Sequence, residues 1–170
     1  MPPKLLIALY LLAIVAANLL VATFGPAVTI ANALLFIGLD LTTRDRLHEA
    51  WRGRGLAWKM AALIAAGSLL SAALNRAAGP IALASFVAFA VSASVDALTY
   101  HALRGRAYTV KVNGSNVLSA AADSLIFPAL AFGLPLLWWV VVGQFAAKVV
   151  GGALWAWVLA ERGAVESVEG

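Results

Sequence analysis

Residues 136–160 read LLWWVVVGQFAAKVVGGALWAWVLA, and Lys148 is the only charged residue in this run. A helix needs about 20 predominantly apolar residues to cross a hydrocarbon core ~30 Å thick. The run is therefore typical of a transmembrane helix. A charge at the centre of a bilayer costs at least ~3 kcal/mol, so such residues usually face a partner, water or a ligand. Lys148 accordingly indicates a polar site inside a membrane bundle.

Composition extends this interpretation to the whole chain. Of its 170 residues, 63% are hydrophobic and only 12% are charged. A soluble domain is roughly 25% charged and 45–50% apolar. A chain this apolar has too little polar surface to dissolve in water, which favours an integral membrane protein.

The apolar runs predict an all-α, polytopic fold with six transmembrane helices in a single domain over residues 1–170. Helix breakers or charges separate the runs, for example at Gly25-Pro26, Gly79-Pro80 and between residues 105 and 114. The expected spans are Leu5–Phe24, Pro26–Leu41, Ala57–Leu74, Pro80–Ala102, Val117–Leu134 and Leu136–Ala160. The second is short and needs the polar residues that follow it to complete a crossing.

The basic residues predict the orientation of these spans. If the N-terminus is cytoplasmic, the inner segments hold Lys4, Arg44, Arg46, Arg52, Arg54, Lys59, Arg104, Arg106, Lys111 and Arg162. The outer loops then hold only Arg76. Under the positive-inside rule this bias places both termini in the cytoplasm. The net charge of +4 is thus explained by topology and contact with the lipid bilayer, and no nucleic-acid partner is expected.

Several function classes find no support in the sequence. There is no cysteine, which removes disulfides, iron–sulfur clusters and thiolate zinc sites. His48 and His101 lie outside the apolar runs, so neither a metal site nor a cofactor is expected. A Walker-type phosphate loop and the residue spacings of hydrolases are absent, so the chain is not expected to be an enzyme.

Polar residues within the spans form a candidate binding site near the middle of the membrane. They are Asn18, Asn32, Asn116, Asp123, Gln144 and Lys148. At ~1.5 Å rise per residue, Asp123 and Lys148 both lie near the midplane. Gln144 is one turn from Lys148 on the same face, and Asn116 shares a face with Asp123. Such faces normally turn toward the interior of a bundle.

Structural explanations compete with this site. Asp123 and Lys148 could form a buried ion pair that only sets helix register, and buried asparagines often contribute interhelical hydrogen bonds worth about 0.6 kcal/mol. Asp40 with Arg44, and Asp96 near Arg104, could be ordinary pairs at the ends of spans that set helix depth. Alternatively Asp40, Arg44 and Asp96 form a cytoplasmic gate or take part in coupling.

The ordered set of motifs resembles the vitamin-uptake, or queuosine-precursor, transporter family of six-helix bacterial membrane proteins. The motifs are ANLLV at residues 17–21, FIGLDLTTR at 36–44, ASFVAF at 84–89 leading to Asp96, SN at 115–116 leading to DSLIF at 123–127, and KV at 148–149. The resemblance covers nearly the whole chain. It implies a multi-pass protein of the bacterial inner membrane that imports 7-cyano-7-deazaguanine or 7-aminomethyl-7-deazaguanine.

The polar residues suit such a modified purine base. A guanine-like edge presents two adjacent N–H donors, which a carboxylate such as that of Asp123 accepts in bidentate fashion. Lys148 or Gln144 could donate to the neighbouring ring carbonyl. Asn18, Asn32 and Asn116 can each donate and accept toward ring nitrogens.

Two other functions remain open at the level of the sequence. The chain could be the substrate-binding membrane subunit of an importer with a separate energising module, and homo-oligomers are compatible with either form. It could also be a non-transporting membrane scaffold in which the charges only pair helices. The energy source is not encoded in any recognisable motif.

Overall fold

The structure is a computed structural model that describes residues 3–37, 39, 43, 47, 51 and 55–166. Every regular element in this part of the chain is helical. The elements are α1 (Pro3–Phe24), the 3-10 turn η1 (Gly25–Val28), α2 (Thr29–Asn32), the π-helical turn η2 (Ala33–Ile37), α4 (Leu56–Leu74), the 3-10 turn η3 (Arg76–Ala78), α5 (Gly79–Ala102), α6 (Tyr108–Phe132) and α7 (Trp138–Glu166).

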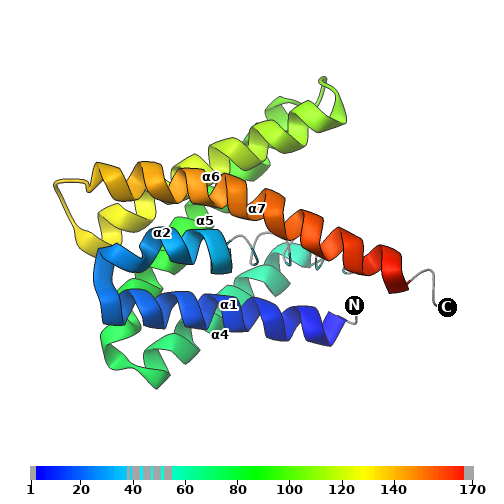
Figure 1. The fold of residues 1–170 in the computed structure, drawn as a ribbon. Helices are drawn as coiled ribbons and strands as arrows, with labels where there is room; N and C mark the ends of the chain where they lie inside the picture. Colours follow the sequence, from blue (N-terminus) through cyan, green and yellow to red (C-terminus); the bar gives the residue numbers. More distant parts are fainter. Residues whose placement is uncertain are drawn as a thin grey trace.

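The chain reverses direction at Gly25. Its φ of +66° lies in the left-handed region, which glycine enters without steric cost. The segment formed by η1, α2 and η2 then runs back beside α1 and lies between α1 and α7 (Figure 1). Asn32 Nδ2 donates to the carbonyl oxygen of Ala17 at 2.9 Å and ties the two segments together.

The lengths of the helices agree with a membrane protein. In the described ranges, the runs Pro3–Phe36, Arg76–Ala102 and Asn113–Phe132 are long and apolar enough to cross a membrane. Trp58–Leu74 and Trp138–Gly151 are apolar but shorter. The all-helical, multi-pass class predicted from the sequence is therefore confirmed.

Many large apolar side chains lie on the surface of the protein. Leu12, Leu69, Leu98 and Val142 are among the exposed ones. The interior contains apolar residues together with several polar ones; the buried polar side chains include Asn18, Thr29, Asn32, Ser71, Ser92, Ser119, Ser124, Gln144 and Lys148. An apolar exterior suits lipid, where a polar group without a partner costs several kcal/mol.

Two apolar clusters pack the ends of α1. Near its start, Leu6 and Tyr10 pack with Met60 and Ile64 of α4. Near its end, Val21 belongs to a cluster with residues of α5 and α6, namely Ile81, Ala84, Ala88 and Phe127. Helix α1 therefore contributes to the packing at both ends of the bundle.

Two glycines let α7 approach the returning segment closely. A Cβ atom at Gly151 would lie 2.5 Å from the carbonyl oxygen of Leu34, and one at Gly143 would overlap the side chain of Ile30. Small residues of this kind let helix backbones approach each other in membranes. The atoms that a Cβ at Gly151 would meet are backbone atoms of Leu34, which cannot avoid the clash by a change of rotamer.

The bounds of helices α6 and α7 differ from those of the expected spans. Helix α6 begins at Tyr108, nine residues before Val117, because helical hydrogen bonding continues through the polar residues that interrupt the apolar run. It ends at Phe132, since Gly133 has a φ of +79°. Helix α7 begins at Trp138 and continues to Glu166. The part of the second expected span after residue 37 lies mostly outside the described residues.

The close approach at Gly151 gives a test of the packing. Replacing a helical glycine by alanine normally stabilises a helix by about 0.5–1 kcal/mol. Gly151→Ala is expected instead to destabilise the protein by about 1–3 kcal/mol, as overpacking does. Thermal unfolding of the detergent-purified protein measures the change. Gly105→Ala is the control, because a Cβ at that turn position meets nothing within 4 Å and no proline follows it. Equal melting temperatures for the two variants would contradict the packing.

Candidate functional site

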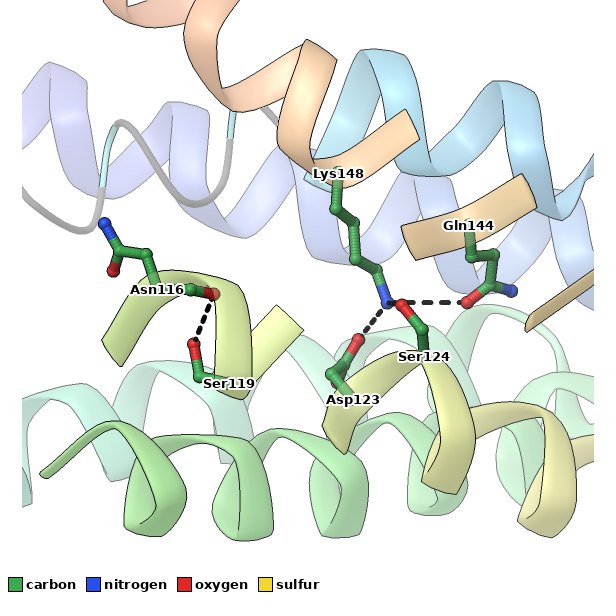
Figure 2. A network of polar contacts seen from close by, with 6 residues as sticks. All are labelled: Asn116, Ser119, Asp123, Ser124, Gln144 and Lys148. Atoms are coloured by element: carbon green, nitrogen blue, oxygen red, sulfur yellow. Dashed lines mark hydrogen bonds and ion pairs between the residues drawn. The ribbon is translucent and has the colours of Figure 1, made fainter. Parts of the chain in front are cut away.

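Lys148 lies at the centre of a buried polar cluster between α6 and α7. Its Nζ donates to the Asp123 carboxylate, to Ser124 Oγ at 3.1 Å and to Gln144 Oε1 at 3.4 Å (Figure 2). A lysine ammonium carries three N–H donors and no acceptor. These three acceptors therefore account for all of its hydrogen-bonding capacity.

A cavity of about 80 Å³ lies beside this cluster, among α1, α2, η2, α4, α5, α6 and α7. Its lining residues are Ala13, Ile14, Ala17, Asn18, Val21, Thr29, Asn32, Phe36, Ile64, Ser85, Phe89, Asp123, Phe127 and Gln144. Pockets that hold drug-sized ligands measure roughly 300–1,000 Å³. The cavity therefore suits only a small ligand, and the bundle must widen around anything larger.

The members of the ion pair differ in their access to the cavity. The side chain of Asp123 is 21% exposed and lines the cavity, whereas that of Lys148 is 2% exposed and does not. Asp123 receives the ammonium through Oδ2. Because an ionised carboxylate offers about four lone-pair sites, Asp123 keeps acceptor capacity on the cavity side.

The two asparagines of the cavity wall also present acceptors. Ser71 Oγ donates to the carbonyl of Gly67 at 2.7 Å, so it can only accept from Asn18 Nδ2, which lies 3.2 Å away. Asn32 Nδ2 donates to a backbone carbonyl, which has no proton to give. Each amide nitrogen thus gives one of its two N–H groups to the protein. The amide oxygens of Asn18 and Asn32 are left as acceptors beside the cavity.

The structure brings together five of the six residues predicted to bind substrate. Four of them line the cavity, namely Asn18, Asn32, Asp123 and Gln144. Lys148 donates hydrogen bonds to Asp123 and Gln144. Asn116 is not part of this group. It is exposed, its side chain is turned away from Lys148 (Figure 2), and its backbone carbonyl accepts from Ser119 Oγ at 3.1 Å.

Of the predicted gating residues, the structure describes Asp96, which lies apart from the cavity. Asp96 is in α5, seven residues beyond the cavity-lining Phe89, which corresponds to about 10 Å along the helix. Its Oδ1 is buried without a hydrogen-bond partner in the described part of the chain. Asp40 and Arg44 lie outside the described residues.

Sequence reasoning missed two serines that support the site. Ser124 accepts from Lys148, and Ser71 holds Asn18. Asp123 and Ser124 occur together in the DSLIF motif, so the position next to a buried acid was an available signal for Ser124. For Ser71 there was none, because the contact joins α1 and α4 and depends on how these two helices are rotated against each other.

The apolar exterior, the long apolar helices and the buried polar cluster beside a cavity are features of a multi-pass membrane protein. The family model described as "Putative vitamin uptake transporter" matches residues 6–160. The chain belongs to this family, as its motifs predicted. Family membership and the apolar helices together support a membrane transporter for vitamin-like substrates rather than an enzyme. No curated protein and no solved structure matches the chain.

The ion pair can be tested by a double-mutant cycle. Removing one partner of a buried pair leaves an uncompensated charge and typically costs 3–5 kcal/mol, so Lys148→Met and Asp123→Asn are each expected to lower stability by about that amount. The double variant is expected to recover most of the loss, because no lone charge remains. Thermal unfolding in detergent measures each effect. Additive losses in the double variant would show that the two groups do not compensate each other.

Proposed function

We propose that this protein imports a queuosine precursor, 7-cyano-7-deazaguanine or 7-aminomethyl-7-deazaguanine, across the bacterial inner membrane. The supporting observation is that the Asp123 carboxylate is held by Lys148 and also lines an interior cavity. Family membership supports uptake of a small organic molecule. The acceptor-rich wall favours a ligand with several N–H donors.

The hydrogen-bonding pattern of a 7-deazaguanine matches this wall. Its N1–H and 2-amino group are adjacent donors, and Asp123 accepts them on the side away from Lys148. The amide oxygens of Asn18 and Asn32 supply further acceptors. Phe36, Phe89 and Phe127 line the same cavity and give the flat ring an apolar surface to pack against.

The proposed topology has six spans with both termini in the cytoplasm. Helix α1 begins near the N-terminus and helix α7 ends near the C-terminus. Both termini lie toward the same end of the bundle (Figure 1). The turn between α5 and α6 carries Arg104 and Arg106 and belongs on the cytoplasmic side under the positive-inside rule. Asp40, Arg44 and Asp96 are proposed to gate or couple the pathway on that side.

A second candidate is a substrate-binding membrane subunit that needs a separate energising module. A carrier moves the base when expressed alone, whereas the subunit binds it without moving it. The same experiment therefore separates the two, and a scaffold would do neither.

Uptake can be measured in a host that lacks its own carrier and cannot make the precursor. We expect the protein to restore queuosine in tRNA at low external precursor. Asp123→Asn is expected to lower uptake by about 100-fold or more, because the new amide replaces one acceptor oxygen by an N–H donor that opposes the donors of the ligand. A site built to hydrogen-bond a substrate group rejects a mismatched partner by as much as about 10⁴-fold. Expression is checked in the membrane fraction.

Asn116→Ala is the matched control, because Asn116 lies on the same helix outside the cavity. It is expected to leave uptake unchanged. Normal uptake by an expressed Asp123→Asn variant would contradict the proposed site. If the unmodified protein takes up neither precursor, the proposed carrier function is wrong.

The orientation can be tested directly, because the chain contains no cysteine. Single cysteines are introduced at the exposed positions Ala77 and Gly105. A membrane-impermeant maleimide is expected to label Ala77→Cys in intact cells and Gly105→Cys only after permeabilisation. The reverse pattern would invert the topology, and labelling of both in intact cells would contradict the number of spans between them.

A further inference from the structure

Lys148 fixes the orientation of the Gln144 side-chain amide. A lysine ammonium can only donate, so the atom of Gln144 that faces it must be the oxygen, Oε1, at 3.4 Å. The amide nitrogen therefore lies on the other side of the group, away from Lys148 (Figure 2). Gln144 is 1% exposed and yet lines the cavity. Its Nε2 is thus a donor placed in a wall otherwise rich in acceptors.

Lys148 itself is not available to a ligand. Its three N–H groups are matched by Asp123, Ser124 and Gln144, and it does not line the cavity. Reaching a ligand would require it to give up one of these acceptors in a low-dielectric interior, where an unpaired polar group is costly.

We propose that Gln144 determines specificity by donating from Nε2 to a ring carbonyl of the ligand, and that Lys148 is the positioning residue that keeps this donor in place. The proposal rests on the proposed function, because it assumes a purine-like ligand whose donor edge meets Asp123. On such a ligand the carbonyl at position 6 is adjacent to N1–H. Asp123 and Gln144 are held by the same ammonium, so one can meet the N–H edge while the other meets the carbonyl.

This arrangement discriminates between 6-oxo and 6-amino ligands. A 6-oxo group accepts from Gln144 Nε2, whereas a 6-amino group opposes one N–H donor with another. Because Lys148 prevents the amide from turning over, Gln144 cannot adapt by offering its oxygen. A buried donor left unpaired corresponds to a loss of affinity on the order of 10- to 100-fold.

The test uses the full-length protein in detergent and a competition assay with two 7-deazapurines. One is 2-amino-6-oxo-7-deazapurine, and the other is its 2,6-diamino counterpart. The unmodified protein is expected to prefer the 6-oxo compound by about 10- to 100-fold. Gln144→Glu is expected to reverse the preference, because one carboxylate oxygen accepts from Lys148 and the other accepts from a 6-amino group.

Two further variants keep the proposal testable if Gln144→Glu does not fold. Gln144→Leu removes the donor and is expected to bring the ratio of the affinities for the 6-oxo and 2,6-diamino compounds close to one. Lys148→Met releases the amide to turn either way and is expected to reduce the preference to less than tenfold. Asn116→Ala is the control: Asn116 is exposed on α6, does not contact Lys148 and does not line the cavity, so this variant should keep the preference of the unmodified protein.

The outcomes separate the two proposals. An unchanged 6-oxo preference in folded Gln144→Glu or Gln144→Leu overturns the role of Gln144 and leaves the transport proposal standing. Binding of guanine but of no 7-deazapurine overturns the proposed substrate. The role of Gln144 is then tested by the ratio of the affinities for guanine and 2,6-diaminopurine. Binding of neither series by the unmodified protein overturns both.

Discussion

The charge on Lys148 is the constraint on which the rest of the interior depends. An ammonium placed in the middle of a membrane helix must find partners, because an unpaired charge there costs at least ~3 kcal/mol. Asp123 supplies the compensating charge, and Ser124 and Gln144 supply the remaining acceptors. Helices α6 and α7 are therefore held at one rotation relative to each other, and the orientations of the cavity-lining Asp123 and Gln144 follow from it.

The segment from Gly25 to Ile37 closes the other side of the cavity. It contributes Thr29, Asn32 and Phe36 to the lining. Its backbone comes against α7 at Gly151 and against α1 through the Asn32 bond to Ala17. The π-helical turn at its end contains the cavity-lining Phe36, in keeping with the frequent placement of such turns at functional sites. A short helical segment thus gains its position from contacts on both flanks.

Much of this architecture could be predicted from the sequence. The length of the apolar runs predicted where most helices lie, because a membrane helix must be apolar over about 20 residues. The cost of a buried charge indicated that Asp123 and Lys148 need polar partners, with an ion pair between them as one alternative. What could not be predicted is how each helix is rotated about its axis. Asn116 shares a periodic face with Asp123 and yet is exposed. It lies about two turns nearer the start of α6, where this helix and the end of α5 project beyond the other helices (Figure 1). The bond between Asn18 and Ser71 and the size of the cavity likewise depend on packing between helices.

The close pairing of Asp123 with Lys148 also has an electrical consequence. A lone elementary charge carried across the membrane does work of about 2.3 kcal/mol for every 100 mV of potential. An ammonium and a carboxylate that move as a unit cancel in this field. Rearrangements of α6 and α7 that keep the two groups together therefore proceed without electrical work from this pair, and the membrane voltage neither drives nor opposes their motion.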